Sequence, residues 1–413
     1  MKIVFIQPKS FHCWEALNIG YLISAIKNEI NADISFFSGF FDRDELIIEG
    51  CRRADIVGVS ATSPQMKHGL FLCAEIKKHS PKCLIIFGGI HPSALPQDTL
   101  ENEIVDVVVT GEGERAIIEV INNRETLLRS KKIINYGYVE NLDDISFPDR
   151  ELIKQGRNIQ QAYRDNGIRI ASIFASRGCP FQCRFCASGA VWGKRVRYRS
   201  VDNIFEEFEK VAKDLRIDFV KFSDDTFTYK KDLVREFCEK KIRHGNRTNW
   251  GCNVRADGIS EDILRLMKES GCSEIWVGVE SGSQQILNDM QKGITIERIK
   301  RIFKLTKNLG FFRRAYMLLG MPNESLEDIK LSEKLVDDIE PDAVGFTILA
   351  PFPGSSFYDS KTHKNVDWSW VDEYENKITR TKYLTNEELH HEQSRLVKKY
   401  QNKAVFRQRE VYV

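Results

Sequence analysis

The sequence predicts an α/β protein in which a doubly wound, Rossmann-like parallel sheet is followed by a partial (β/α)6 barrel of TIM type. Two observations predict this class: near-continuous apolar runs alternate with helical patterns, and the alternation occurs twice along the 413 residues. A chain of this length exceeds one ordinary core, which favours several domains. We therefore expect a sheet domain at 1–125, a linker at 126–165, a barrel at 166–360 and a helical segment at 361–413.

Five apolar runs in the first part have the composition of strands, and amphipathic segments separate most of them. These runs are 2–7, 33–38, 54–62, 83–89 and 105–110. Sheets of this kind bind ligands at the carboxyl ends of their strands. The residues expected at those ends are Ser60, Gly88, Gly89, His91, Gly111, Glu112 and Gly113. Ordinary strand-to-helix turns use glycines in the same way. Since no G-x-G-x-x-G follows the first run, a dinucleotide site is not expected.

The second alternation follows a polar, charged connection that contains one short strand candidate, KIINYGYV. Six strand candidates then alternate with helical patterns. They are 169–175, 218–223, 249–254, 274–279, 312–319 and 343–349. Six successive β-α units predict an open or partial barrel, whose chemistry is expected at the carboxyl ends of the strands.

Three helices of this part have readable limits. Ser260 is expected to cap one helix that Gly271 ends, and Ser325-x-x-Asp328 is a capping box that opens another. Residues 386–404 are expected to form an amphipathic, solvated helix.

Composition and charge exclude several classes of protein. A hydrophobic fraction of 42% beside 29% charged residues is typical of a globular chain. A formal net charge of +2 lacks the excess basicity of nucleic-acid binders. No apolar stretch is long enough to span a bilayer, and the first run is too short for a secretory signal. We expect a cytoplasmic protein with neither nucleic acid nor membrane as a partner.

Three of the ten cysteines are grouped: Cys179, Cys183 and Cys186 lie in SRGCPFQCRFC, directly after the first strand of the second alternation. Thiolates bind iron-sulfur clusters and zinc. In a cluster of four irons, three cysteines leave one iron open to a small molecule. A structural zinc site needs a fourth Cys or His nearby, and the next histidine is His244. The pattern favours a catalytic cluster, with structural zinc and three unrelated thiols as the alternatives.

This CxxxCxxC pattern, with Phe185 before its last cysteine, resembles the signature of the radical S-adenosylmethionine superfamily. Similar family elements follow at the later strand ends, in SDDTF, GVESG, LLGMPNE and APFPG. The first part, with GVSAT, GGIHPS and GEGE, resembles the cobalamin-binding domain fused to many such enzymes, as in the anaerobic magnesium-protoporphyrin ester cyclase group. The D-x-H-x-x-G motif that supplies an axial histidine in other cobalamin domains is absent.

The resemblance implies a [4Fe-4S] cluster on the three cysteines and S-adenosylmethionine on its open iron. Reductive cleavage of that cofactor would give a 5′-deoxyadenosyl radical, which takes a hydrogen atom from a small-molecule substrate. An electron donor such as flavodoxin or ferredoxin is implied as a partner, and cobalamin as a further cofactor. The strand ends of the first part, His91 included, would then contact cobalamin.

The resemblance also assigns roles in the barrel. Catalytic roles fall to Asp224, Asp225 and Glu280, and cofactor contacts to Phe185, Arg255, Glu280, Ser281, Leu318 and Gly320. Several of these residues have a structural alternative: a salt bridge between Glu280 and Arg255, a turn cap for one aspartate, and plain barrel core for Leu318.

Several functions remain open. The first is methylation of an unactivated carbon in a small molecule. The second keeps the radical chemistry without methyl transfer, as a cyclase, rearrangement or dehydrogenation. The third is a non-catalytic protein with a zinc-filled site. A methylthiotransferase is a weaker candidate, because additional N-terminal cluster cysteines and a C-terminal RNA-binding module are not evident.

Overall fold

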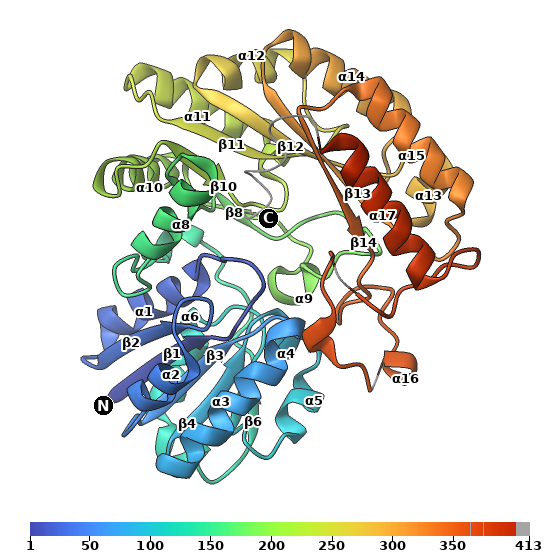
Figure 1. Ribbon diagram of the computed structural model, residues 1–413. Helices are drawn as coiled ribbons and strands as arrows, with labels where there is room; N and C mark the ends of the chain where they lie inside the picture. Colours follow the sequence, from blue (N-terminus) through green and yellow to red (C-terminus); the bar gives the residue numbers. More distant parts are fainter. Residues whose placement is uncertain (364, 375, 402–413) are drawn as a thin grey trace. The chain divides into compact units, whose positions relative to one another are not determined.

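The computed structural model describes residues 1–363, 365–374 and 376–401, which form two compact units (Figure 1). The first unit comprises 1–158, 186–195 and 352–371, and the second comprises 159–185, 196–351 and the part from 372 onward. Residues 126–158, expected within the linker, thus pack with the first unit. The boundaries near 125, 165 and 360 stay predictions, and residues 402–413 of the expected C-terminal segment lie outside the described residues.

The first unit is built on a six-stranded parallel sheet in the order β2-β1-β3-β4-β5-β6. Its strands are β1 (Lys2–Gln7), β2 (Asp33–Ser38), β3 (Ile56–Ser60), β4 (Leu84–Gly88), β5 (Val107–Val109) and β6 (Lys132–Ile134). The five predicted strands are confirmed, three of them one or two residues shorter at each end. β6 comes from the strand candidate of the expected linker and pairs with β5 at the edge of the sheet.

Helices cover both faces of this sheet, as its continuous apolar strands predict. They are α1 (Leu17–Glu29), α2 (Asp44–Gly50), α3 (Met66–His79), α4 (Ile90–Ala94), α5 (Pro96–Glu101), α6 (Glu114–Asn122) and α7 (Arg124–Leu127). α1 contacts α6, and α2 contacts α3. Because β1 lies between β2 and β3, the strand order reverses there, and ligands of such sheets bind outside the carboxyl ends at this reversal.

The second unit contains a six-stranded parallel sheet in the order β14-β13-β12-β11-β10-β7. Its strands are β7 (Ile170–Ile173), β10 (Phe219–Phe222), β11 (Asn249–Val254), β12 (Cys272–Glu280), β13 (Phe312–Leu319) and β14 (Ala343–Ile348). Neighbours in the chain are neighbours in the sheet, with β7 and β14 as its two edges. The predicted partial barrel is confirmed.

Helices alternate with these strands. They are α10 (Val201–Asp214), α11 (Lys231–Arg243), α12 (Glu261–Glu269), α13 (Gln284–Asp289), α14 (Ile296–Asn308) and α15 (Leu326–Ile339). Ser260 precedes α12 as predicted, although its side chain makes no capping hydrogen bond. The capping box of Ser325 and Asp328 is present at the start of α15, so this sequence signal is confirmed.

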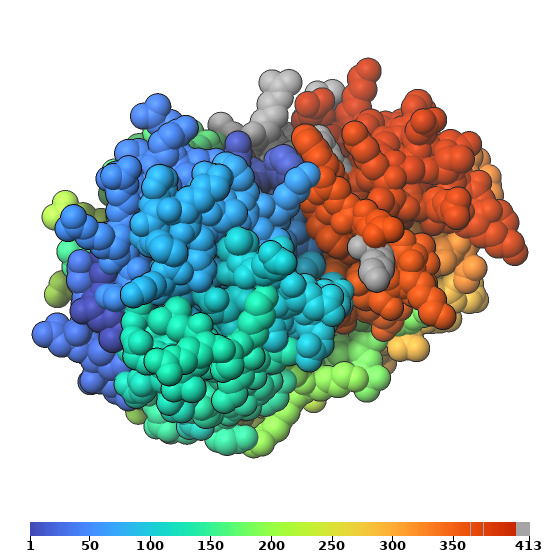
Figure 2. Space-filling view, turned by 90° about the horizontal axis from the view of Figure 1, so that it is seen from below, coloured from blue at the N-terminus to red at the C-terminus, as the bar shows by residue number. Residues whose placement is uncertain are grey.

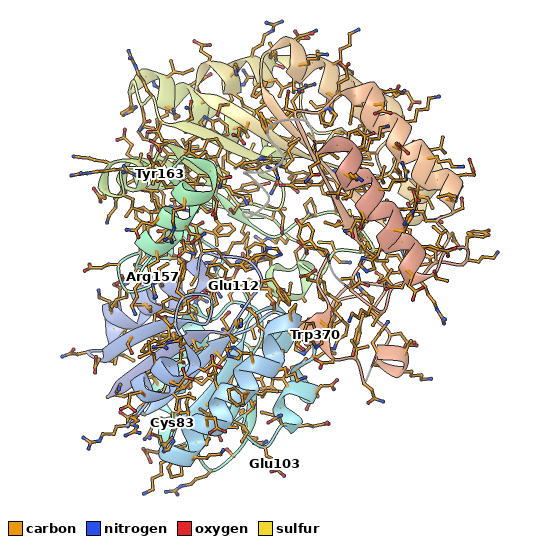
Figure 3. The ribbon with its side chains drawn as sticks, in the orientation of Figure 1. Cys83, Glu103, Glu112, Arg157, Tyr163 and Trp370 are labelled. Atoms are coloured by element: carbon orange, nitrogen blue, oxygen red, sulfur yellow. The ribbon has the colours of Figure 1, made fainter. Side chains whose placement is uncertain are left out.

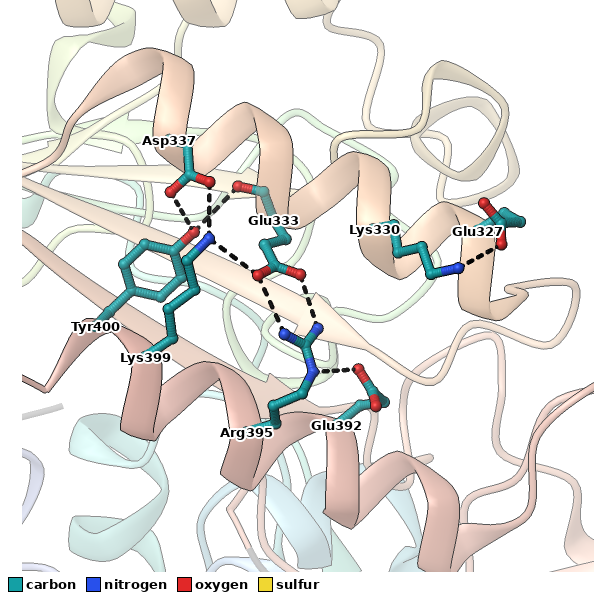
Figure 4. A network of polar contacts seen from close by, with 8 residues as sticks. All are labelled: Glu327, Lys330, Glu333, Asp337, Glu392, Arg395, Lys399 and Tyr400. Atoms are coloured by element: carbon teal, nitrogen blue, oxygen red, sulfur yellow. Dashed lines mark hydrogen bonds and ion pairs between the residues drawn. The ribbon is translucent and has the colours of Figure 1, made fainter.

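The C-terminal helix α17 (Asn386–Tyr400) packs on β14, so one face of the predicted solvated helix is buried instead. Polar contacts join the C-terminal part of α17 to α15 (Figure 4). Arg395 Nη2 lies 2.7 Å from Glu333 Oε2, and Lys399 Nζ lies 2.9 Å from Glu333 Oε1. The hydrogen bond from Arg395 lowers the pKa of Glu333 to about 2. Within the described part of the chain, no helix combines the length and apolarity needed to cross a membrane.

Candidate active site

The grouped cysteines lie on the loop after β7 and the short strand β8 (Ser176–Arg177), which pairs antiparallel with β9 (Arg197–Tyr198). Cys179 and Cys183 are partly exposed and Cys186 is exposed, whereas the seven other cysteines are buried. None of the ten forms a disulfide. Partly exposed thiols on a loop are accessible as ligands, while the buried ones behave as small hydrophobic side chains.

Side chains of the barrel hold this loop in place. The guanidinium of Arg255 lies 3.7 Å from the centroid of the Phe181 ring, which meets Tyr229 edge-on at 5.8 Å. The main-chain N–H of Arg184 donates to the carbonyl of Met290 at 2.9 Å. The loop is therefore held through residues beside its cysteines, while Cys179 Sγ lies 3.7 Å from Thr226 Oγ1 and Cys186 Sγ lies 3.2 Å from Ser188 Oγ.

The donor set fits an iron-sulfur cluster with one open iron. Among the described residues, no three His, Cys, Asp or Glu side chains are placed to share a single metal ion. A cubane cluster binds each thiolate through a different iron and needs no such convergence. Arg255 and Lys292 add positive charge close to the loop, which suits an anionic cluster.

Glu280, at the end of β12, forms a buried ion pair with Lys292, whose Nζ lies 2.6 Å from Glu280 Oε1. The same Nζ lies 5.6 Å from the centroid of the Phe185 ring. Burial lowers the pKa of Lys292, but the Glu280 carboxylate and the Cys183 thiol raise it, and the net direction is upward. Lys292 therefore stays cationic beside the cysteine loop. Glu280 itself has a φ of +65°, a strained conformation of the kind that collects at functional sites.

The alternative pairing of Glu280 with Arg255 is wrong. Arg255 Nε donates to Asp257 Oδ1 at 3.0 Å, and its Nη2 donates to the Lys292 carbonyl at 2.7 Å. These bonds leave the Arg255 side chain beside Phe181, near the loop. A contact between Arg255 and the cofactor stays a prediction.

Asp224 and Asp225, at the end of β10, differ in environment. Asp224 is 1% exposed, and its carboxyl group accepts hydrogen bonds from the Ala175 N–H at 3.1 Å and from the Ser176 hydroxyl. Burial raises the pKa of Asp224 to about 6. Asp224 therefore holds the chain just before the cysteine loop, whereas the exposed Asp225 is accessible to a ligand. The catalytic roles of both stay predictions.

The remaining barrel residues that are predicted to contact the cofactor, Ser281, Leu318 and Gly320, are buried. Ser281 is fully buried, and its Oγ lies 3.3 Å from Ser332 Oγ. Leu318 is 7% exposed and shares its register position with Thr347 of β14. Gly320 N donates to a carboxyl oxygen of Glu324, a fully buried residue whose pKa burial raises to about 8. The structure thus brings these residues to the carboxyl end of β12 and β13, and their cofactor contacts stay predictions.

In the first unit, the ends of β3 and β4 carry the first predicted cofactor residues. Ser60 Oγ accepts a hydrogen bond from Asn18 Nδ2 at 2.6 Å. Gly88 ends β4, and Gly89 has a φ of +100°. A Cβ at Gly89 would lie 2.8 Å from the Ala61 carbonyl oxygen. Glycine is required there both by conformation and by space.

His91 is buried in the first turn of α4, and its Nδ1 lies 2.9 Å from Ser63 Oγ. Burial lowers the pKa of His91 to about 4, so the imidazole is neutral near pH 7. The contact of His91 with the cofactor stays a prediction. The neutral imidazole already has one partner within the protein, Ser63.

The end of β5 carries the remaining residues. Gly111 N donates to Ser93 Oγ at 3.0 Å, and the buried Glu112 (Figure 3) accepts from Val139 N at 2.7 Å. A Cβ at Gly113 would lie 2.9 Å from a methyl group of Leu22. The Glu112 carboxylate thus fixes the chain after β6, and Gly113 permits close packing with α1. Small residues at three adjacent strand ends fit a ligand held at this edge of the sheet.

Two later segments of the chain pack on the same unit. α9 (Gly189–Trp192), which follows the cysteine loop, contacts α4, and the 3-10 turn at Trp368–Trp370 contacts α3. Figure 2 shows the segment around 352–371, in orange, against the light-blue residues of this unit. The space a side chain would need at Gly354 is taken by three alanines, Ala94, Ala187 and Ala190.

Gly354→Ala is expected to destabilise the protein by roughly 1–3 kcal/mol. Its φ is +94°, and the new Cβ would lie 3.0 Å from the Cβ of Ala190. Thermal denaturation measures the change. Gly156→Ala is the matched control, since its Cβ meets no atom within 4 Å, and a variant pair with equal melting temperatures would contradict this account of the contact.

Sequence reasoning missed Lys292 and Glu324. Lys292 lies in a loop outside every motif, and the only signal was indirect: a carboxylate at the end of the apolar strand WVGVE needs a partner. Glu324 stood within LLGMPNE, but nothing in the sequence indicated its complete burial.

Two family models match the chain. Residues 173–336 match the Radical SAM superfamily, and residues 9–121 match the B12 binding domain. The first range contains the three grouped cysteines and every predicted barrel residue. The second contains every predicted residue at the carboxyl edge of the first sheet.

Individual proteins are similar over most of the chain. An uncharacterized methyltransferase of Pyrococcus horikoshii, PH0819, is 27% identical over 85% of this chain and 79% of its own length. The anaerobic magnesium-protoporphyrin IX monomethyl ester cyclase of Cereibacter sphaeroides is 26% identical to this chain. That match covers 86% of this chain and 62% of the cyclase. The solved radical S-adenosylmethionine methyltransferase TsrM from Kitasatospora setae, with cobalamin and a [4Fe-4S] cluster bound, has a TM-score of 0.71 at 17% identity. That match covers 88% of this chain and 78% of TsrM, and it shows a shared fold.

Proposed function

Since the chain belongs to the radical S-adenosylmethionine superfamily and carries an N-terminal B12-binding domain, we propose that this enzyme methylates an unactivated carbon of a small molecule. The two domains imply its cofactors: a [4Fe-4S] cluster, S-adenosylmethionine and cobalamin. Relatives named as methyltransferases support the proposal, among them cytidylyl-2-hydroxyethylphosphonate methyltransferase of Streptomyces wedmorensis and hopanoid C-3 methylase of Methylococcus capsulatus.

When bound, these groups supply a reductively generated radical for hydrogen abstraction and a methyl group for transfer. The protein's part is to bind and orient. Cys179, Cys183 and Cys186 would hold the cluster, while the Arg255 stack on Phe181 and the hydrogen bonds of Asp224 keep their loop in place. Residues of the first sheet from Ser60 to Gly113 would hold cobalamin at the carboxyl edge.

The Glu280–Lys292 pair is proposed to position S-adenosylmethionine. It keeps a carboxylate and an ammonium fixed at the end of β12, close to Phe185. A zwitterionic methionine tail has both charges and matches such a pair.

A reductant of the flavodoxin or ferredoxin type is proposed as the electron donor, since cleavage of the cofactor consumes an electron. A cytoplasmic location is proposed on the cysteines: ten thiols without a disulfide fit a reducing compartment.

The observation that carries the proposal is the cysteine loop itself, the one place where cysteines of this chain leave the core. Anaerobic reconstitution with iron, sulfide and hydroxocobalamin tests it. The wild-type chain is expected to gain iron and sulfide and to release 5′-deoxyadenosine from S-adenosylmethionine. Cys179→Ala, Cys183→Ala and Cys186→Ala are each expected to abolish that release.

Cys51→Ala is the matched control, because Cys51 is a buried cysteine of the first unit and should leave the release intact. Full activity of the loop variants, or zinc in place of iron and sulfide, would overturn the proposal.

A radical reaction without methyl transfer is the second candidate, favoured by the similarity to the cyclase of Cereibacter sphaeroides. Mass analysis of products separates the two. A gain of one methyl group together with consumption of methylcobalamin supports the first candidate alone.

A further inference from the structure

The turn that follows β10 brings a hydroxyl group to the first cysteine of the loop. Thr226 Oγ1 lies 3.7 Å from Cys179 Sγ, within hydrogen-bonding range of a sulfur atom, although the two residues are 47 positions apart in the chain. The Thr226 residue is only 7% exposed. The fold therefore makes this contact, and it largely excludes water from the threonine.

The Thr226 hydroxyl has no capping role that would explain its position. Thr226 is the N-cap residue of the 3-10 turn Phe227–Tyr229, where a threonine oxygen commonly accepts a hydrogen bond from the main chain. Here the side chain makes no such bond. Among the described residues, the Cys179 thiol is the hydrogen-bonding partner that this hydroxyl has. The oxygen is thus turned toward the cysteine loop instead of its own turn.

Packing on both sides holds Thr226 in place. The next residue, Phe227, is 1% exposed, and its ring centroid lies 4.2 Å from that of Phe222 in the core. On the other side, the carbonyl of Asp224 accepts a hydrogen bond from Asn253 Nδ2 at 3.1 Å. The hydroxyl therefore occupies a fixed place before any ligand binds.

A bound cluster would fix the direction of the hydrogen bond. In the free chain, either the Cys179 thiol or the Thr226 hydroxyl can donate. A cysteine that binds a metal does so as a thiolate and carries no proton. The sulfur is then an acceptor only, so Thr226 must be the donor.

A donor at this sulfur changes how readily the cluster accepts an electron. Hydrogen bonds to the sulfur atoms are among the features that set the reduction potential of an iron-sulfur cluster. Reduction adds one negative charge to the cluster and its ligands, and a hydrogen bond is stronger when its acceptor carries more negative charge. The Thr226 hydroxyl would therefore stabilise the reduced state more than the oxidised state.

We propose that the Thr226 hydroxyl donates a hydrogen bond to the Cys179 thiolate of the bound cluster and thereby raises the reduction potential of that cluster. The electron itself comes from the one-electron donor of the flavodoxin or ferredoxin type. This inference rests on the proposed function, because it requires a cluster on the cysteine loop. It requires neither cobalamin nor substrate.

Potentiometric titration of the full chain tests it. The chain is reconstituted anaerobically with iron and sulfide alone, and the electron paramagnetic resonance signal of the reduced cluster is followed against the applied potential. Thr226→Val keeps the branched shape and removes the hydroxyl. It is expected to make reduction about fivefold less favourable, which lowers the midpoint potential by about 40 mV for one electron. Thr226→Ser keeps the hydroxyl and is expected to stay close to the wild-type potential.

Thr228→Val is the matched control. Thr228 belongs to the same turn and is 1% exposed, and its Oγ1 has no hydrogen-bond partner among the described residues. This variant tests the effect of a buried valine in the turn without the loss of a bond to sulfur. It is expected to keep the wild-type potential.

An unchanged potential in Thr226→Val, or an equal fall in both valine variants, would overturn the inference. If Thr226→Val assembles no cluster, Thr226→Ala removes the same hydroxyl, and an unchanged potential in that variant also overturns it. A wild-type chain that assembles no cluster overturns the proposed function and the inference together. An unchanged potential in a chain that holds its cluster overturns the inference alone.

Discussion

Lys292→Met is expected to lower the free energy of unfolding by roughly 3–5 kcal/mol, the cost of leaving one partner of a buried ion pair alone. Lys292 and Glu280 are only 10% and 11% exposed, so water cannot replace the lost ammonium. The remaining carboxylate would sit at a residue with positive φ beside Phe185 of the cysteine loop. Release of 5′-deoxyadenosine is expected to fall about a hundredfold, the scale of a small misplacement of reacting groups.

Chemical denaturation and a single-turnover assay measure the two effects. The double variant Lys292→Met/Glu280→Gln removes both charges and is expected to recover most of the stability but not the activity. Lys300→Met, which breaks the exposed pair with Asp338, is expected to leave the melting temperature unchanged. A stability loss in Lys300→Met as large as that in Lys292→Met would contradict the importance assigned to burial.

Glu324→Gln is expected to flatten the dependence of stability on pH. The carboxyl group of Glu324 is fully buried, with Oε2 accepting from two backbone N–H groups and Oε1 without a hydrogen-bond partner. Burial raises its pKa from 4.5 to about 8. Between these values the folded state binds one proton more than the unfolded state. Stability from this group is therefore present below about pH 4.5 and is lost as pH rises through about 8, by about 1.4 kcal/mol per pH unit.

Urea unfolding of wild type and variant at several pH values between about 6 and 8 measures this slope. Glu324→Gln is expected to become relatively more stable with each step upward in pH. Asp224 and Glu373 titrate in the same direction, so some slope should remain in the variant. Glu327→Gln, at an exposed position in the first turn of α15 (Figure 4), should keep the wild-type slope. Parallel curves for wild type and Glu324→Gln would contradict the burial of a neutral carboxyl group.

The two sheets could be predicted because their strands are buried on both faces and so read as continuous apolar runs. The capping box of Ser325 and the cysteine loop were also readable, since each depends on residues close together in sequence. β6 was only partly readable: the sequence marks KIINYGYV as a strand candidate in the expected linker, but its place at the edge of the first sheet comes from pairing with β5.

The parts of the site that the sequence did not reveal depend on contacts between distant residues. For Glu280 the sequence offered a cofactor contact or a salt bridge to Arg255, and only the fold brings Lys292 to its carboxylate. Asp224 was readable as a polar residue at a strand end, but its bonds to Ala175 and Ser176 come from register with β7.

Electron paramagnetic resonance of the reduced, reconstituted chain tests the central claim, that three cysteines hold a cluster with one iron open to S-adenosylmethionine. The account predicts about four irons and four sulfides per chain, and a signal that changes when S-adenosylmethionine is added. A signal that saturating S-adenosylmethionine leaves unchanged would contradict it.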